Sequence, residues 1–236
     1  MTVHLEFVAD SLVAVVSLDS PPLNIFDLEM RDGLIEAIHA VRDVPDVRAM
    51  ILRSTGRHFS AGADLREFGS APSIFEARRI RWDRDPWGPL WDCPVPTIAA
   101  LRGVAVGSGM EIAMLCDLRV AEPTTQLGLP ETKLGMLPAA GGTQSLTRAI
   151  GPHAALPLVA SAITIDAAEA LARGVVSFVS DDADARAFEL ARWFASLDAK
   201  TVAATRRALR VAGDLPLEVG LIAEKRLAAT LASLRR

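Results

Sequence analysis

A single carboxylate stands in an otherwise apolar stretch of the sequence. Residues 107–116 read GSGMEIAMLC, and Glu111 is the only charged side chain among them. An ionised carboxylate in apolar surroundings costs free energy unless a partner compensates it. We therefore expect Glu111 either to face water or to be held inside the protein for acid–base chemistry.

Two glycine-containing segments each lie where a strand is expected to lead into a helix. Residues 59–65 read FSAGADL and residues 103–111 read GVAVGSGME. Glycine permits tight turns, and the free N–H groups at a helix N-terminus attract negative charge. Two such turns facing each other would offer two N–H donors to one carbonyl oxygen, which is an oxyanion hole. The alternative is a pair of ordinary strand–helix turns, and neither segment has the spacing of a dinucleotide-binding motif or a P-loop.

A third segment carries a second candidate acid. Residues 127–143 read LGLPETKLGMLPAAGGT, and Glu131 follows Glu111 by 20 positions (131 − 111). Two carboxylates that converge on one carbonyl pocket could handle a proton and a water molecule. The alternative for Glu131 is a solvated carboxylate in a loop.

The elements that would position these segments alternate between strands and helices. Apolar and β-branched runs predict strands at 3–8, 12–18, 47–52, 97–101 and 118–121, the first two as a hairpin. Helices are expected at 28–43 behind the N-cap Asp27, at 74–91 and at 109–116. Short connections between alternating strands and helices indicate an α/β fold with partly parallel pairing.

After about residue 140 the pattern becomes helical. Helices are predicted at 142–150, 153–160, 166–173, 184–195, 199–211 and 217–234, with one strand at 175–179. These helices are rich in alanine, and their apolar faces need a cover. Either the helices pack on one another or a second copy of the chain supplies it.

Length, charge and cysteine content restrict the function classes. The chain has 236 residues, half of them hydrophobic, which is ample for one large domain. A net charge of −4 gives no electrostatic case for nucleic acid, and two cysteines form neither a disulfide framework nor a metal motif. We find no basic leader and no apolar run long enough for a membrane span, so a soluble cytoplasmic protein is expected.

Three motifs together resemble the enoyl-CoA hydratase/isomerase (crotonase) superfamily. They are FSAGADLREF, GVAVGSGMEIAMLCDLRVA and LGLPETKLGMLPAAGGTQSLTRAIG, and the resemblance runs from about residue 18 to residue 231. It implies the α/β crotonase fold, a ClpP-like spiral of ββα units. It also implies a core domain over 1–195 and a C-terminal helical trimerisation segment over 196–236, shorter than usual. The implied assembly is a homotrimer or a dimer of trimers.

The resemblance assigns roles to single residues. Glu111 and Glu131 match the catalytic glutamates of the family's hydratases. The backbone N–H groups of Ala63 and Ser108 match its oxyanion hole, and no metal site is implied. The positions that match the family's substrate and coenzyme A groove are Leu23, Ile25, Ala61, Asp64, Leu65, Val104, Gly107, Gly109, Pro130, Pro138 and Ala139. Ser108 and Ala139 stand where the family commonly has glycine. Their larger side chains would narrow the acyl pocket.

The two glutamates favour hydration of a 2-trans-enoyl-CoA to a 3-hydroxyacyl-CoA. Glu111 and Glu131 would hold and deprotonate one water beside the polarised thioester, and Glu131 would protonate Cα. No cofactor is implied beyond coenzyme A as part of the substrate. The same fold also hosts double-bond isomerases, thioester hydrolases and decarboxylases. An acyl-CoA-binding scaffold without turnover is the non-enzyme alternative.

Residues 78–92, RRIRWDRDPWGPLWD, hold three of the four tryptophans. In the family this region forms part of the lid over the acyl chain. Trp82, Trp87 or Trp91 could therefore shape the acyl pocket, and an arginine could reach coenzyme A. The alternative, favoured by the interleaved opposite charges, is a helix packed by its tryptophans with solvated arginines.

Overall fold

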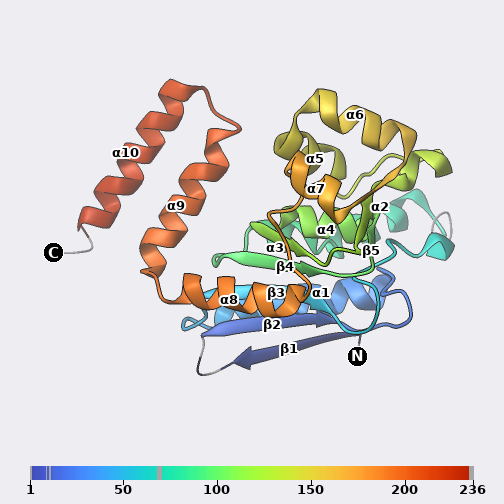
Figure 1. The fold of residues 1–236 in the computed structure, drawn as a ribbon, viewed down its shortest axis with the longest axis horizontal. Helices are drawn as coiled ribbons and strands as arrows, with labels where there is room; N and C mark the ends of the chain where they lie inside the picture. Colours follow the sequence, from blue (N-terminus) through green and yellow to red (C-terminus); the bar gives the residue numbers. More distant parts are fainter. Residues whose placement is uncertain (1, 9, 11, 68–70, 234–236) are drawn as a thin grey trace.

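A six-stranded sheet forms the centre of the fold (Figure 1). The computed structural model describes residues 2–8, 10, 12–67 and 71–233, without the side chains of 78–81. The strands, in order across the sheet, are β1 (Val3–Val8), β2 (Val13–Leu18), β3 (Ala49–Ser54), β4 (Thr97–Leu101), β6 (Leu118–Ala121) and β9 (Phe178–Val179). β1 and β2 pair antiparallel, and all later neighbours pair parallel. The expected α/β fold is confirmed; two residues of the expected β1–β2 turn, 9 and 11, lie outside the described part.

Both faces of this sheet are buried, and side chains alternate between them. In β2, Ala14 and Val16 belong to one apolar cluster, whereas Val13 and Val15 belong to the other. Helix α8 (Ala183–Ala195) covers the second face with alanines and Leu190. A strand buried on both faces reads as a continuous apolar run, and this is why its position was visible in the sequence.

The three strands of a second sheet were not predicted individually, although the crotonase resemblance implies two sheets. They are β5 (Val104–Val106), β7 (Gln126–Gly128) and β8 (Thr164–Asp166). Strands of three residues are too short to show an alternating pattern, and β5 lies inside the glycine-containing segment expected to be a turn. The sequence also placed the strand at 175–179, where only β9 (Phe178–Val179) forms.

The helices mostly begin and end as predicted. Asp27 caps α1 (Leu28–Asp43), since its Oδ1 accepts the Met30 N–H at 2.8 Å. The remaining helices around the site are α4 (Ser108–Leu115), α5 (Gly142–Ile150), α6 (Pro152–Ser161) and α7 (Ala167–Arg173). None of the helices that the structure describes combines the length and the apolar character of a membrane span.

The prediction of one helix over 74–91 is wrong. The chain forms α2 (Ile74–Asp83) and then α3 (Trp87–Trp91). Pro86 disfavours the helical conformation of the residue before it, and Asp85 accepts the Trp87 N–H at 3.0 Å to start the second helix. The break turns α3 relative to α2 and brings its tryptophans to the site described below.

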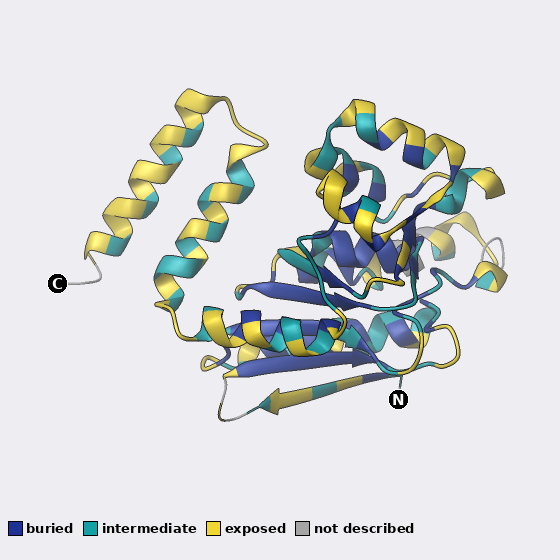
Figure 2. Ribbon diagram, viewed as in Figure 1, coloured by how far each residue is buried: buried dark blue, intermediate teal, exposed yellow. Residues whose placement is uncertain are grey.

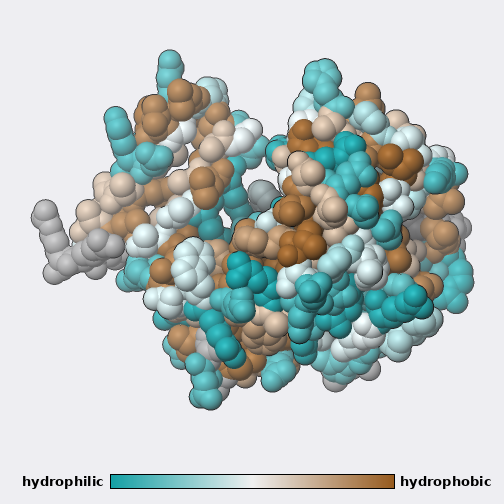
Figure 3. All heavy atoms as spheres, viewed as in Figure 1, coloured by the Kyte–Doolittle hydropathy of each residue, from teal (hydrophilic) through white to brown (hydrophobic). Residues whose placement is uncertain are grey.

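Helices α9 (Ala199–Ala212) and α10 (Leu217–Ser233), here called the arm, pack on each other and extend away from the sheets (Figure 1). Neither helix has a buried residue (Figure 2). Apolar side chains gather on the arm's surface (Figure 3). The exposed ones are Leu209, Leu215, Leu217, Val219, Leu221 and Ile222. The domain division at residue 195 and the assembly through this segment stay predictions.

Candidate active site

A cavity of about 1210 Å³ lies between segments that are far apart in the sequence. Its lining includes residues from 61–65, from α3 and α4, and from 130–141. The sequence-predicted residues that line it are Leu23, Ile25, Ala61, Ala63, Asp64, Leu65, Gly107, Ser108, Glu111, Pro130, Glu131 and Ala139. The fold therefore brings the three motifs to one place.

Three other predicted residues are not among those that line the cavity, but they support its walls. They are Val104, Gly109 and Pro138. The Val104 carbonyl accepts the Ser60 N–H at 3.0 Å. A Cβ on Gly109 would lie 2.7 Å from Cβ of Ser60, so glycine lets α4 approach this loop. The Pro138 ring lies against Gly142 at the start of α5, 3.0 Å from where a Cβ would stand.

Two backbone loops meet beside the cavity. Ser60 joins them, because its N–H donates to Val104 at 3.0 Å and its carbonyl accepts the Val106 N–H at 3.1 Å. Among the described residues, none accepts a hydrogen bond from the backbone N–H of Ala63 or of Ser108. Ser108 is the first residue of α4, and such an N–H has no partner within its own helix. Two backbone donors are thus left for a ligand.

Gly107 brings the helix start close to Glu131. Its φ of 54° lies in the left-handed region, where glycine is favoured. A Cβ there would lie 3.3 Å from Glu131 Oε1 and 3.6 Å from the Gly62 Cα. Glycine suits the backbone conformation here, and a larger residue would crowd the Glu131 carboxyl.

Glu111 is held inside the protein, which decides between the two expectations for it. It is 2% exposed, and its Oε1 accepts N–H groups from Ala140 at 2.8 Å and Gly142 at 3.0 Å. Gly142 is the first residue of α5, so the carboxylate lies at the positive end of that helix. Hydrogen bonds from two backbone donors stabilise the ionised form.

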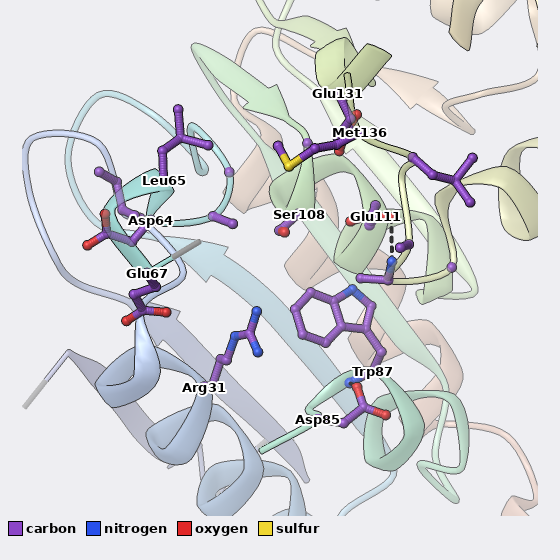
Figure 4. A pocket seen from close by; sticks show the side chains of 18 of the residues that line it. Arg31, Asp64, Leu65, Glu67, Asp85, Trp87, Ser108, Glu111, Glu131 and Met136 are labelled. Atoms are coloured by element: carbon purple, nitrogen blue, oxygen red, sulfur yellow. Dashed lines mark hydrogen bonds between the residues drawn. The ribbon is translucent and has the colours of Figure 1, made fainter. Parts of the chain in front are cut away.

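Glu131 has a different environment. It lies in the short helix η3 (Pro130–Leu134), and its Oε2 is buried with no hydrogen-bond partner among the described residues. Burial raises the pKa of Glu131 to about 7, and the charge of Glu111 adds to this increase. Near neutral pH this carboxyl can therefore both donate and accept a proton. Figure 4 shows both glutamates and Ser108 on one side of the cavity, with Trp87 facing them.

The tryptophan-rich segment contributes a wall that the favoured interpretation of the sequence did not include. Trp82, Trp87 and Trp91 all line the cavity. Trp87 also packs the helix down, since it is 7% exposed and its ring centroid lies 5.9 Å from that of Phe26. The Arg31 guanidinium lies over the same ring, 5.4 Å from its centroid. The side chains of 78–81, including three of the arginines, lie outside the described part.

Two more lining residues were missed for different reasons. Leu115 follows Glu111 by four residues on α4, so helical spacing alone could have placed it on the same face. Arg31 lies on α1, and nothing in the sequence connects that helix with the glycine-containing motifs. Its place in the lining depends on how α1 and α3 pack.

Comparison with known proteins gives one consistent result. The sequence model described as "Enoyl-CoA hydratase/isomerase" matches residues 9–234. "Probable enoyl-CoA hydratase echA8" of Mycobacterium bovis is 36% identical over 223 residues, 92% of this chain and 85% of that protein. "Methylglutaconyl-CoA hydratase, mitochondrial" of Mus musculus is 37% identical over 199 residues, 81% of this chain and 63% of that protein.

Solved structures agree with the sequence comparison. Enoyl-CoA hydratase subunit I of Geobacillus kaustophilus superposes with a TM-score of 0.91 at 31% identity, covering 99% of this chain and 90% of that one. Enoyl-CoA hydratase of Bacillus anthracis gives 0.90 at 30% identity, covering 97% and 90%. The protein thus has the crotonase fold, and it is an enzyme of the enoyl-CoA hydratase/isomerase family.

Proposed function

We propose that the protein hydrates 2-trans-enoyl-CoA thioesters to 3-hydroxyacyl-CoA. The observation that carries this proposal is the pair of glutamates on one cavity in unlike environments. Glu111 is fixed by two N–H donors, and Glu131 is half-buried with a pKa of about 7. Hydration needs a base for the water and an acid for Cα, and two carboxyls of different proton affinity can supply both.

The thioester oxygen would accept hydrogen bonds from the N–H groups of Ala63 and Ser108. Both donors border the cavity and lack protein acceptors among the described residues. Their polarisation of the carbonyl makes Cβ of the conjugated double bond electrophilic. Each such donor contributes about 3 kcal/mol to the lowering of the barrier.

One proton shared by the two glutamates balances the reaction. The Glu111 carboxylate accepts a proton from water while the water oxygen bonds to Cβ. Protonated Glu131 then gives its proton to Cα as the enolate collapses. Afterwards Glu111 holds the proton, and its return to Glu131 through the next water restores the starting state.

Coenzyme A would enter as part of the substrate, along the predicted groove. Leu23 and Ile25 line the cavity beside Ala61 to Leu65, and the Ala61 N–H donates to the Leu23 carbonyl at 2.9 Å. The Asp64 carboxylate in this segment is held by the Arg66 guanidinium, with Oδ2 at 2.6 Å from NH2. A homotrimer or a dimer of trimers belongs to the same proposal, supported by the exposed apolar side chains of the arm.

The test is product analysis by mass with trans-2-butenoyl-CoA. The wild type should add one water and keep coenzyme A, and Glu131→Gln or Glu111→Gln should lower the rate at least about 100-fold. Glu36→Gln, an exposed glutamate on α1, is the matched control and should retain activity. Release of free coenzyme A, loss of carbon dioxide, or an isomer of unchanged mass would replace hydration by a sister reaction.

A further inference from the structure

The arm is attached to the core through arginines rather than through a buried apolar face. α9 has no buried residue, yet Arg206 and Arg210 reach from it to the end of α3 and to Asp117, which lies between α4 and β6. We propose that this arginine pair positions the acyl wall, defined here as Trp87, Gly88 and Trp91 of α3. The pair thereby sets how well the cavity accepts long acyl groups. The proposal rests on the proposed function only in taking an acyl-CoA as the ligand.

Arg210 contacts Trp91 in two ways. Its guanidinium lies over the indole ring, 4.4 Å from the centroid, and its NH1 donates a hydrogen bond to the Trp91 carbonyl. Its NH2 also lies 3.2 Å from Asp117 Oδ1. One planar side chain therefore fixes both the ring and the backbone of a cavity-lining residue.

Arg206 fixes the next residues of the same segment. Its NH1 donates to the Cys93 carbonyl at 3.1 Å, and its NH2 lies 2.6 Å from Asp117 Oδ2. Asp117 is anchored to the central sheet, because its Oδ2 accepts the Thr97 N–H at 2.8 Å. The pair thus connects the arm, the end of α3 and β4 through one carboxylate.

These ion pairs are shielded from water. The side chains of Arg206, Arg210 and Asp117 are 12%, 23% and 20% exposed. Exposed ion pairs contribute little to stability. Partly buried ion pairs with additional hydrogen bonds are not easily displaced by water. Removing Arg210 would leave the Trp91 carbonyl without this donor and would take one of two guanidinium partners from Asp117.

α3 needs such support from outside. It has five residues and includes Gly88 and Pro89, and the Asp85 carboxylate accepts the Trp87 N–H at its start. A helix this short is not stable on its own. Trp87 and Leu90 hold α3 to the core by their burial, and the arginine pair holds its C-terminal end.

The Trp91 end of the acyl wall lies where only longer acyl groups reach, because Trp87 faces the glutamates whereas Arg210 joins Trp91 to Asp117 just after the end of α4. Ser108, Glu111 and Leu115 line the cavity along successive turns of α4, a span of about 10 Å. Helix α3 packs on α4 and completes the lining with Trp91 and with Trp87, the latter shown in Figure 4. A short acyl group ends near Glu111 and Trp87, whereas a long one continues to Leu115 and Trp91. A shift of α3 should therefore change binding of long acyl groups and spare short ones.

The experiment measures dissociation constants of two saturated, unreactive ligands, butanoyl-CoA and decanoyl-CoA, by calorimetry on the full chain. In Arg210→Ala the ratio of the two constants should change about fivefold, with the constant for butanoyl-CoA within about twofold of wild type. Arg210→Lys keeps a positive charge near Asp117 but loses the planar contact with Trp91, so it should show part of the change. Arg207→Ala, an exposed arginine on the same helix, is the control and should leave the ratio unaltered.

A double-mutant cycle tests whether Arg210 acts through Trp91. In a Trp91→Ala background, Arg210→Ala should cause no further change in the ratio. An equal change in both backgrounds, an unchanged ratio, or equal weakening of both ligands would overturn the proposal. Circular dichroism and size-exclusion chromatography check folding and assembly; if Arg210→Ala fails either, Arg210→Lys decides under the same criteria.

Turnover separates this inference from the proposed function. If the wild type binds both ligands but hydrates no enoyl-CoA, hydration is excluded while the change in the ratio still decides the role of the arginine pair. If the wild type binds neither ligand, both proposals fail.

Discussion

Glu111 and Glu131 are chemically identical side chains, and their neighbours give them different tasks. The N–H groups of Ala140, before α5, and of Gly142, its first residue, donate to Glu111 Oε1 and hold it in place. Glu131 has a buried oxygen without a donor among the described residues, and burial raises its pKa to about 7. At neutral pH the pair can hold one proton between them, which is the state that the proposed mechanism uses.

The pH dependence of hydration follows from this pairing. We expect kcat/KM to decrease above pH about 7 as one proton leaves the free enzyme, because ionised Glu131 has no proton for Cα. The dehydration of 3-hydroxyacyl-CoA should show the same decrease, since the net reaction exchanges no protons and its equilibrium constant is independent of pH. Initial rates in both directions between pH about 6 and 9 measure this. A flat profile in that range would exclude the shared-proton mechanism.

Gly107→Ala tests whether catalysis needs the close approach between the turn before α4 and Glu131. Gly107→Ala should lower kcat about tenfold or more, because the new Cβ would lie 3.3 Å from Glu131 Oε1 and push that carboxyl aside. The control is Gly174→Ala, which has the same kind of positive φ at 81° but no atom within 4 Å of the new Cβ. Both variants should lose about 1–2 kcal/mol of stability to backbone strain, and only Gly107→Ala should lose activity. Equal activities in the two variants would show that backbone strain alone matters.

At the scale of elements, the start of α5 is the part of the scaffold closest to the chemistry. It has no side-chain cap of its own, and Glu111 from α4 accepts its N–H groups instead. The helix start and the carboxylate therefore position each other. The close contact between the start of α5 and the Glu111 carboxylate requires glycine at position 142, because a Cβ there would lie 2.9 Å from Glu111 Oε1.

Gly142→Ala should separate activity from helix stability. Alanine favours a helix, but the close contact should displace the start of α5 and lower kcat about tenfold while leaving the fold intact. Gly220→Ala in α10, with nothing within 4 Å, is the control and should keep full activity with a gain of about 0.5–1 kcal/mol. Steady-state kinetics and urea unfolding report the two effects. Wild-type kcat in Gly142→Ala would mean that Glu111 needs no fixed donors.

The elements also show what the sequence could and could not predict. α1 was predicted to the residue, because Asp27 is a cap and the apolar spacing behind it is regular. The division between α2 and α3 was missed although Pro86 marks it, since the apolar tryptophans continue across the break. The strands β5, β7 and β8 were missed because three residues carry no detectable period.

For the site, motifs predicted the residues that lie near one another in the chain. The acyl wall and Arg31 join the cavity only through the packing of α1, α3 and α4. No local pattern encodes that packing. The contacts of Arg206 and Arg210 with residues more than 90 positions earlier were likewise invisible.

At the scale of the whole molecule, a site of this kind lowers global stability. The folded protein keeps Glu131 in surroundings that favour its proton, whereas the unfolded chain leaves it in water. Between the reference pKa of 4.5 and the folded value of about 7, the folded state binds more protons than the unfolded state. The free energy of unfolding must then decrease as pH rises through that window.

Glu131→Gln should remove this dependence and stabilise the protein at high pH. Glutamine keeps the shape of the side chain without a charge to desolvate, so the variant should be more stable than wild type at pH about 8, by about 1–2 kcal/mol after allowance for solvent screening. At pH about 5 the two should differ by less, because wild-type Glu131 is then still protonated in the folded state. Urea unfolding at both pH values and equal protein concentration measures the difference. Glu36→Gln, whose carboxylate is exposed in the folded state, should show no such change with pH. A Glu131→Gln variant that is less stable at the higher pH would mean that the ionised carboxylate is stabilised in the fold, which would remove the physical basis for its role as the acid.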